Sequence, residues 1–393
     1  MKGFFSSSQM VATTPGKGLA PKCGACGFYK RCESPKMPVH GDGAKGVLIV
    51  GDFPSKEDDE QGRPFGGESG QYLRQRLGQI GVRLDRDTWT TNALICTPSW
   101  KGKADTKTIG YCNPNLRQVL SDLKPRVVLT LGHYALTSVL MGTWSDMDVL
   151  ERWVGWQIPV EGRWVCPTYH PNFLTRMNNS LMERQFSDHL EAAFHLDTPP
   201  APSVDYSKRI VVSYDDNEVL TTLKEIDRQG GWVAFDYETN SLKPEYEHSF
   251  IYSCAVSNGE RTIAYLWNDR TAAYTRRFLI SKRTRKIASN LKFEERWTLK
   301  TFGHGVRRWG WDTMLASHCL DNRPGICSLK FQAFVRMGVP VYNADVAPFL
   351  ESKGRYNRIR EADPHTVLFY NGMDAILEHE LAAIQRKDMG YDE

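Results

Sequence analysis

The sequence predicts two α/β domains, the first built on a mainly parallel sheet, with a proline-rich linker between them. Three observations support this prediction. A length of 393 residues favours two domains of ordinary size. Short apolar segments alternate with amphipathic segments, as strands and helices do along a parallel sheet. A stretch rich in proline interrupts that alternation near residue 200.

These observations set the expected boundaries. We expect four segments, the first of which is rich in Ser, Thr, Gly and Pro and is predicted to be disordered or draped over the surface. The segments are 1–20 (the N-terminal stretch), 21–196 (the first domain), 197–208 (the linker) and 209–393 (the second domain).

The composition is that of a globular protein. Hydrophobic residues make up 41% and charged residues 24% of the chain, and no apolar run is long enough to span a bilayer. The segment from Met1 to Ser8 becomes polar too early for a signal peptide, so we expect a cytoplasmic protein with no membrane contact. A net charge of +4 permits nucleic acid as a partner without requiring it.

In the first domain, apolar runs and amphipathic runs follow one another in order. The expected elements are strands at 46–51, 89–96, 126–132 and 164–167 and helices at 71–80 and 116–123. Polar loops at 52–70, 92–101 and 168–176 each follow a strand. In a parallel sheet the ligand site lies beyond the carboxyl ends of the strands, so these loops are expected to form it.

The second domain has its strands concentrated early. We expect strands at 209–212, 231–236, 250–256 and 262–266, and a largely helical remainder.

Four of the nine cysteines have the spacing of metal ligands. Cys23 and Cys26 form a C-x2-C pair, and Cys96 and Cys112 form a C-x15-C pair. Both zinc and an iron–sulfur cluster accept four thiolates, so the spacing favours a metal site without choosing the metal. Cys32 has no assigned role. The remaining cysteines are expected to be buried and structural: Cys166, Cys254, Cys319 and Cys327.

Polar residues at strand ends are candidates for recognising a nucleobase. Asn92 ends a predicted strand, and its amide donates and accepts hydrogen bonds at once, as reading a base edge requires. Taken singly, such residues have plainer explanations: a strand-end asparagine is often a cap, an aromatic residue after proline, such as Phe65, is usually core, and His170 before proline often marks a turn.

Four acidic residues of the second domain are candidates for a metal centre. Asp236 and Glu238 follow a buried strand segment and lie on one face, because alternate residues of a strand point the same way. Glu294 and Asp374 add two carboxylates, and Tyr370 precedes Asp374 by one helical turn. Buried carboxylates need neutralising cations, and hard oxygen ligands suit two Mg²⁺ or Mn²⁺ ions. Solvated surface charge is the alternative explanation.

The first domain resembles the iron–sulfur uracil-DNA glycosylases of families 4 and 5. The resemblance covers residues 23–176 and rests on the four cysteines and on the segments 51–54, 62–67, 91–92 and 169–171 in the family's order. It implies a structural [4Fe-4S] cluster held by Cys23, Cys26, Cys96 and Cys112.

The resemblance also implies roles for the pocket residues. Phe65 would stack on a flipped uracil, Asn92 would pair with its edge, and His170 would hydrogen-bond the oxygen on which negative charge develops. The implied substrate is uracil-containing DNA.

Two residues depart from the family's pattern. Asp52 is shorter than the usual glutamate, so any water that it positions would lie elsewhere, and Phe53 replaces a methyl group with a ring. If Phe53 points inward, it fills the space for the base, and the domain would then be a catalytically dead module that binds DNA or a polymerase. The residues expected to grip DNA in that case are Trp100, Lys101, Lys103 and Arg176.

The second domain resembles the DEDD 3′–5′ exonucleases, especially the proofreading domain of family-A DNA polymerases. The resemblance covers residues 209–385 and rests on the segments 235–239, 311–315 and 370–374. It implies a ribonuclease-H-like fold with a mixed sheet, two cations bound by Asp236, Glu238, Glu294 and Asp374, and a water oriented by Tyr370. Asp312 is expected to support structure. Glu294 stands where most relatives have Asp, and a longer carboxylate still reaches a metal.

Together the two resemblances predict a protein of DNA replication and repair, of phage or bacterial type. Its exonuclease would trim single-stranded or frayed 3′ ends of DNA, and its other domain would recognise or excise uracil. A separately encoded polymerase is a candidate partner, for which the exonuclease would proofread.

Overall fold

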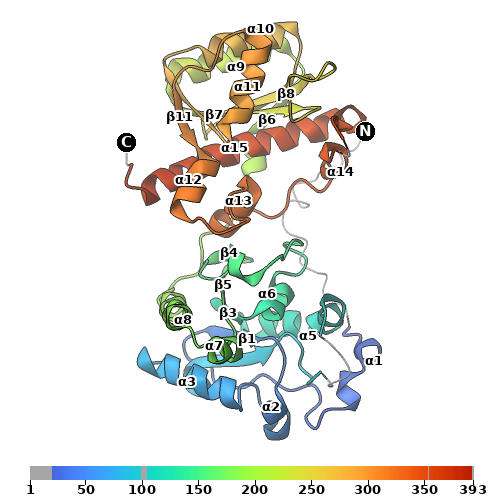
Figure 1. The fold of residues 1–393 in the computed structure, drawn as a ribbon, viewed down its shortest axis with the longest axis vertical. Coiled ribbons are helices and arrows are strands. Elements are labelled where there is room, and N and C mark those ends of the chain that lie inside the picture. Colours follow the sequence, from blue (N-terminus) through green and yellow to red (C-terminus); the bar gives the residue numbers. More distant parts are fainter. Residues whose placement is uncertain (1–19, 99–103, 353, 392–393) are drawn as a thin grey trace. The chain divides into compact units, whose positions relative to one another are not determined.

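A computed structural model describes residues 20–98, 104–352 and 354–391. The chain divides into two compact units (Figure 1): the first runs to Ser203 and includes Val335–Pro340, and the second comprises Val204–Phe334 and the chain from Val341 onward. Within the described ranges, no helix has both the length and the apolar character needed to cross a membrane.

The first unit is built on a five-stranded sheet in the order β2-β1-β3-β5-β4. Four strands are parallel, and only β4 at the edge runs antiparallel to its neighbour. The strands are β1 (Val47–Gly51), β2 (Thr88–Asn92), β3 (Val127–Leu131), β4 (Ile158–Val160) and β5 (Arg163–Thr168). The predicted parallel-sheet α/β domain is confirmed.

Eight helices of four residues or more belong to the described part of this unit. They are α1 (Cys23–Cys26), α2 (Lys56–Gln61), α3 (Glu68–Gln79), α4 (Leu84–Asp87), α5 (Thr106–Leu123), α6 (His133–Leu140), α7 (Pro171–Met177) and α8 (Ser180–Phe194). Helix α5 begins ten residues before the predicted start, because Asp105 and Thr108 form a capping box there.

The strand predicted at 89–96 is shorter than expected, since β2 ends at Asn92. The backbone then bends, and Leu94 and Cys96 pack instead into a small core with Phe28 and Ile109. The main core of the unit lies between the sheet and its helices, where Ile49, Leu129 and their neighbours are fully buried. The early end of β2 thus turns the C-terminal part of the segment toward the cysteines.

The second unit is built on a six-stranded mixed sheet in the order β11-β10-β7-β8-β9-β6. The strands β7, β8 and β9 form an antiparallel meander, and β10 and β11 add to β7 in parallel. The strands are β6 (Ile210–Ser213), β7 (Gly231–Thr239), β8 (Ile251–Ser257), β9 (Thr262–Leu266), β10 (Thr284–Ala288) and β11 (Trp309–Asp312). The predicted mixed sheet is confirmed.

The expectation of a largely helical segment after residue 266 is wrong at β10 and β11. Both strands are short, and β10 carries Arg285 and Lys286, which interrupt the apolar pattern that predicts a buried strand. Lys286 is nevertheless buried, because its ammonium donates to the backbone oxygens of Ser281 and Thr284.

The helices of the second unit are α9 (Asp216–Gln229), α10 (Asp269–Leu279), α11 (Leu291–Phe302), α12 (Thr313–Leu320), α13 (Leu329–Met337), α14 (Ala347–Leu350) and α15 (Pro364–Asp388). The long helix α15 (red in Figure 1) runs across the sheet and contacts β6 through β10. This packing brings residues near the C-terminus of the chain against β7, at the centre of the sheet.

Candidate active sites

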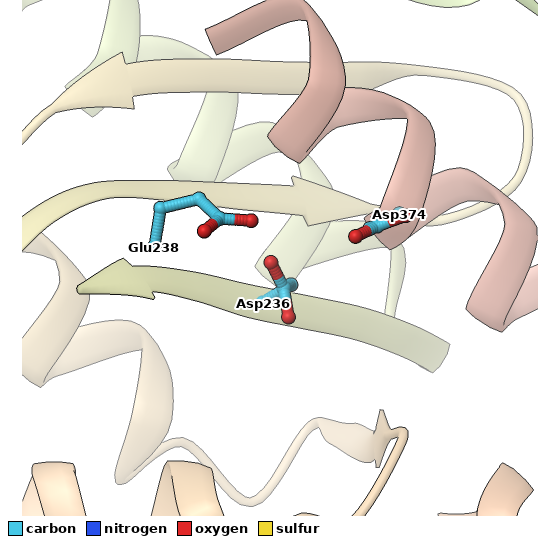
Figure 2. Close-up of side chains that lie close together, drawn as sticks. All are labelled: Asp236, Glu238 and Asp374. Carbon is cyan, nitrogen blue, oxygen red and sulfur yellow. The ribbon is translucent and has the colours of Figure 1, made fainter. Parts of the chain in front are cut away.

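Three carboxylates of the second unit converge at the contact between β7 and α15. Asp236 and Glu238 lie on β7 and Asp374 lies on α15, and one oxygen of each lies within 4.8 Å of the others. Figure 2 shows the Glu238 and Asp374 carboxylates turned toward the space beside Asp236. Asp236 and Glu238 are two residues apart on β7, so their side chains lie on the same face of the sheet, as the sequence predicts.

This acidic group is electrostatically unfavourable without a cation. Burial raises the pKa of Asp236, and the charge of Asp374 raises it further. Burial, and then the charges of Asp236 and Asp374, raise the pKa of Glu238 well above its usual value. Carboxylate oxygens at this separation are the donor set that Mg²⁺ and Mn²⁺ prefer, so these residues fit a divalent ion.

Tyr370 lies at the edge of the acidic group. The Nζ atom of Lys330 lies 2.8 Å from the Tyr370 hydroxyl and 3.5 Å from Oδ2 of Asp374. Tyr342 donates its hydroxyl hydrogen to Oδ1 of Asp374. The tyrosine that the sequence predicts to orient water is therefore held in place by a lysine.

Glu294, on α11, is the fourth predicted acid. Its side chain is 2% exposed, and its Oε2 has no hydrogen-bond partner among the described residues. Burial, and then the charge of Asp236, raise the pKa of Glu294 well above its usual value. It does not belong to the group of three oxygens that lie within 4.8 Å of one another.

Asp312 and Asn371 hold this centre in place. Asp312 accepts hydrogen bonds from the backbone N–H groups of Asn290 and Leu291, at the start of α11. Asn371 donates to Oδ2 of Asp236 at 2.6 Å and accepts from the hydroxyl of Ser253. Asp312 thus has the supporting contacts expected of it.

In the first unit, the predicted pocket residues line one cavity of about 490 Å³. This volume lies within the range of sites that bind small molecules or single bases. The predicted residues that line it are Asp52, Phe53, Phe65, Asn92, His170 and Arg176. Trp100, Lys101 and Lys103, the other expected grip residues, lie outside the described residues.

Gly51 makes the close packing of Phe65 and Asn92 possible. A Cβ atom at Gly51 would lie 2.4 Å from Oδ1 of Asn92 and 2.8 Å from Cζ of Phe65. Phe65 itself adopts a left-handed backbone with φ of 56°. Asn92 is buried, and its Nδ2 has no hydrogen-bond partner among the described residues. A buried donor without a partner, in the wall of a cavity, is suited to a ligand oxygen.

His170 is a neutral hydrogen-bond donor at this cavity. Its Nδ1 accepts from the backbone N–H of Asn172 at 3.2 Å, so the ring proton lies on Nε2. Burial lowers its pKa to about 4, and the imidazole therefore stays uncharged at neutral pH.

Asp52 and Phe53 show how the departures from the family's pattern are accommodated. Oδ1 of Asp52 accepts from the backbone N–H of Ala135 at 2.8 Å, and burial raises the pKa of Asp52 to about 7. Phe53 is 39% exposed, and its ring packs 6.2 Å from that of Tyr134. The cavity remains open with Phe53 in its wall.

The four predicted cysteine ligands line a second, apolar pocket. The backbone N–H of Lys36 points at Sγ of Cys96 from 3.2 Å, and Nδ2 of Asn115 lies 3.5 Å from Sγ of Cys112. Burial raises the pKa of Cys96 to about 12, so an uncompensated thiolate there is unfavourable. Four thiols around one pocket, two of them with an amide donor at the sulfur, fit an iron–sulfur cluster. Cys32, which is not part of the pocket lining, interacts with the side chain of Cys96.

The first unit is similar in sequence to known proteins. Residues 38–194 match the model of the uracil DNA glycosylase superfamily. The type-4 uracil-DNA glycosylase of Pyrobaculum aerophilum is 33% identical over 162 residues, which cover 40% of this chain and 82% of that protein. Residues 38–194 are a uracil-DNA glycosylase superfamily domain. The type-4 enzyme of Thermotoga maritima is 26% identical over 176 residues, covering 44% of this chain and 88% of that protein.

The second unit matches a different family. Residues 211–384 match a 3′–5′ exonuclease model of the type found in family-A DNA polymerases. A solved structure described as Brucella melitensis NrnC with bound Mg²⁺ covers 47% of this chain and 81% of its own, at 17% identity and a TM-score of 0.34. The chain therefore joins a glycosylase-superfamily domain to a 3′–5′ exonuclease domain, and the exonuclease domain implies a divalent metal.

Four residues of the exonuclease centre were not predicted from the sequence: Lys330, Tyr342, Asn371 and Glu378. Asn371 and Glu378 had a usable signal, because they lie three residues before and four after Asp374 and so share its helix face. Lys330 and Tyr342 reach the site only through the packing of α13 and the segment that follows it, and their local sequence carries no such signal.

Proposed function

We propose that the second domain hydrolyses DNA phosphodiesters from the 3′ end with two divalent cations. The convergence of Asp236, Glu238 and Asp374 on one point carries this proposal. Glu294, buried beside them with an unpartnered oxygen, supports a second cation shared with Asp236. When bound, the cations would activate the attacking water and stabilise the leaving 3′ oxygen.

The residues around the acids have separate tasks in this proposal. The Tyr370 hydroxyl orients the attacking water, and Lys330 fixes that hydroxyl from 2.8 Å. Asn371 fixes Asp236 through its 2.6 Å hydrogen bond and so holds the orientation of a carboxylate that would bind the cations. Exonuclease chemistry of this kind relies chiefly on positioning and charge.

The test uses two single-stranded oligonucleotides labelled at the 5′ end, identical except for one internal uracil. With Mg²⁺, both should be shortened from the 3′ end in single-nucleotide steps, and without Mg²⁺ neither should. Intact strands with Mg²⁺, under conditions where the chain is folded, would contradict the proposal.

We further propose that the first domain excises uracil from DNA. The unpartnered Nδ2 of Asn92 and the Nε2–H of His170 are two donors at one open cavity, beside an aromatic ring at Phe65. Asn92 would pair with the uracil edge, and the neutral His170 would stabilise the oxygen on which charge develops when the glycosidic bond breaks. Cys23, Cys26, Cys96 and Cys112 would hold a [4Fe-4S] cluster that braces the loops nearby.

The same oligonucleotides test this second proposal. Incubation without Mg²⁺ followed by alkali should cleave the uracil strand at one position and leave the control strand intact. An intact uracil strand would favour the alternative, in which this domain only binds DNA or a polymerase. The open cavity beside Phe53 argues against that alternative.

In a cell, both activities would act on the same polymer. We propose a role in the replication and repair of DNA in bacteria or in bacterial cells infected by a phage. There the exonuclease removes mispaired 3′ ends and the other domain excises uracil. A separately encoded polymerase is the partner that this role suggests.

A further inference from the structure

Glu378 is a buried acid of the exonuclease centre that belongs to none of the motifs described above. It lies on α15 four residues after Asp374, so Tyr370, Asp374 and Glu378 occupy one face of the helix, which packs against β7. Its side chain is 1% exposed. It interacts electrostatically with Asp236, Glu294 and Asp374, the three acids that the proposed cations would join.

The two carboxylate oxygens of Glu378 have different surroundings. Oε1 accepts a hydrogen bond from the backbone N–H of Ser289 at 3.0 Å. Oε2 is buried without a hydrogen-bond partner among the described residues, as is Oε2 of Glu294. An unpartnered buried carboxylate oxygen is costly, and a pair of them on two neighbouring acids points to a positive ligand.

The contact with Ser289 links Glu378 to Glu294. Three consecutive backbone N–H groups, at Ser289, Asn290 and Leu291, donate to buried carboxylates of Glu378 and Asp312. Asn290 adopts a left-handed backbone with φ of 67° and begins α11, the helix that carries Glu294. The position of Glu294 therefore depends on a turn that Glu378 holds from one side.

We propose that Glu378 is a fifth carboxylate of this centre, which positions Glu294 through Ser289 and whose charge strengthens the binding of the second cation. The proposal rests on the two-cation exonuclease centre proposed above. Glu378 acts here as a positioning residue and as an additional negative charge, outside the three converging oxygens of Asp236, Glu238 and Asp374. A unit charge a few ångströms from a cation in a buried site changes its affinity by about tenfold or more.

The test is a titration of the full chain with Mn²⁺, in which free Mn²⁺ is followed by electron paramagnetic resonance. The variant Glu378→Gln keeps an oxygen that accepts from Ser289 and removes the charge. Wild type should bind two Mn²⁺ ions in this domain, and Glu378→Gln should bind one normally and the other about tenfold more weakly or worse. Glu380→Gln, two residues further on α15, is the matched control, because Glu380 is partly exposed and pairs with Arg209. It should bind both ions as wild type does.

A second readout separates this role from a purely structural one. In the presence of a chelator, Glu378→Gln should unfold at the wild-type temperature or above, because it removes one of several mutually repelling acids. If Glu378→Gln does not fold, Glu378→Asp replaces it: the shorter side chain keeps the charge but loses its reach to Ser289, and should still weaken the second ion.

Normal binding of both ions by Glu378→Gln, or by Glu378→Asp in its place, would overturn this inference and leave the exonuclease proposal standing. A wild-type chain that binds no Mn²⁺ in this domain would overturn both.

Discussion

The two sites of this chain present opposite electrostatic problems. The exonuclease centre gathers buried carboxylates that repel one another, with unpartnered oxygens on Glu294 and Glu378. The glycosylase-like cavity places two uncharged donors, the Asn92 amide and the neutral His170, at about 490 Å³ of open space. The first site is incomplete without cations, whereas the second is formed before its ligand arrives.

This difference follows from the charge that each site must stabilise. A phosphodiester and its leaving oxygen are anionic, so an acidic site reaches them only through metal ions. A departing uracil carries its charge on a base oxygen, which hydrogen-bond donors reach directly. Substitutions that change charge should therefore act strongly at the first site, and those that remove donors should act at the second.

The largest expected effect is that of Asp236→Asn. Asp236 is one of the three converging carboxylates that would hold the proposed cations, so its loss should reduce 3′–5′ exonuclease activity by about 1,000-fold. Uracil excision by the same preparation should be unchanged, which makes it the internal control. An exonuclease rate within about tenfold of wild type would mean that the acids converge for another reason.

Asn92→Ala should produce the next largest effect, at the other site. It removes the buried Nδ2 donor, and uracil excision should fall by about 100-fold while exonuclease activity is retained. The measurement is alkali-sensitive cleavage of the uracil strand in the absence of Mg²⁺. Equal excision by the variant and wild type would remove Asn92 from base recognition.

These two sites also differ in how far the sequence predicted them. The mainly parallel sheet of the first domain followed from apolar runs, both family resemblances followed from short motifs, and the mixed sheet followed from the second resemblance. The missed parts are those that depend on tertiary packing: strand β10, whose buried Lys286 disguises it, and Lys330, which arrives beside Tyr370 on a separate helix. Local patterns predict which strand ends carry polar residues, and packing alone determines which distant side chains join them.

Asp52 should give uracil excision a pH dependence of its own. Burial raises its pKa from 3.8 to about 7, so the carboxylate form increases as the pH rises through 7. If the carboxylate positions the attacking water, excision should rise about tenfold between pH 6 and pH 8. His170, with its pKa near 4, stays neutral over this range.

Asp52→Asn provides the control for this pH profile, which should become flat and slow. The stability of the fold should change with pH in the opposite direction to the excision rate. A raised pKa in the folded state stabilises the fold fully below pH 3.8, and this contribution is lost as the pH rises through 7. The thermal unfolding temperature of wild type should therefore fall, relative to that of Asp52→Asn, as the pH rises from 3.8 to 7.

Phe53→Ala should have the smallest effect, and it distinguishes an enzyme from a binding module. The ring is 39% exposed and packs on Tyr134 in the cavity wall, so its removal should change excision by about twofold or less. In the alternative, Phe53 blocks the base, wild type is inactive, and removing the ring admits uracil. A variant that excises uracil while wild type does not would therefore show that this ring keeps the cavity closed in solution. Equal activity in both proteins would show that Phe53 is accommodated in the wall of a working site, as its contact with Tyr134 indicates.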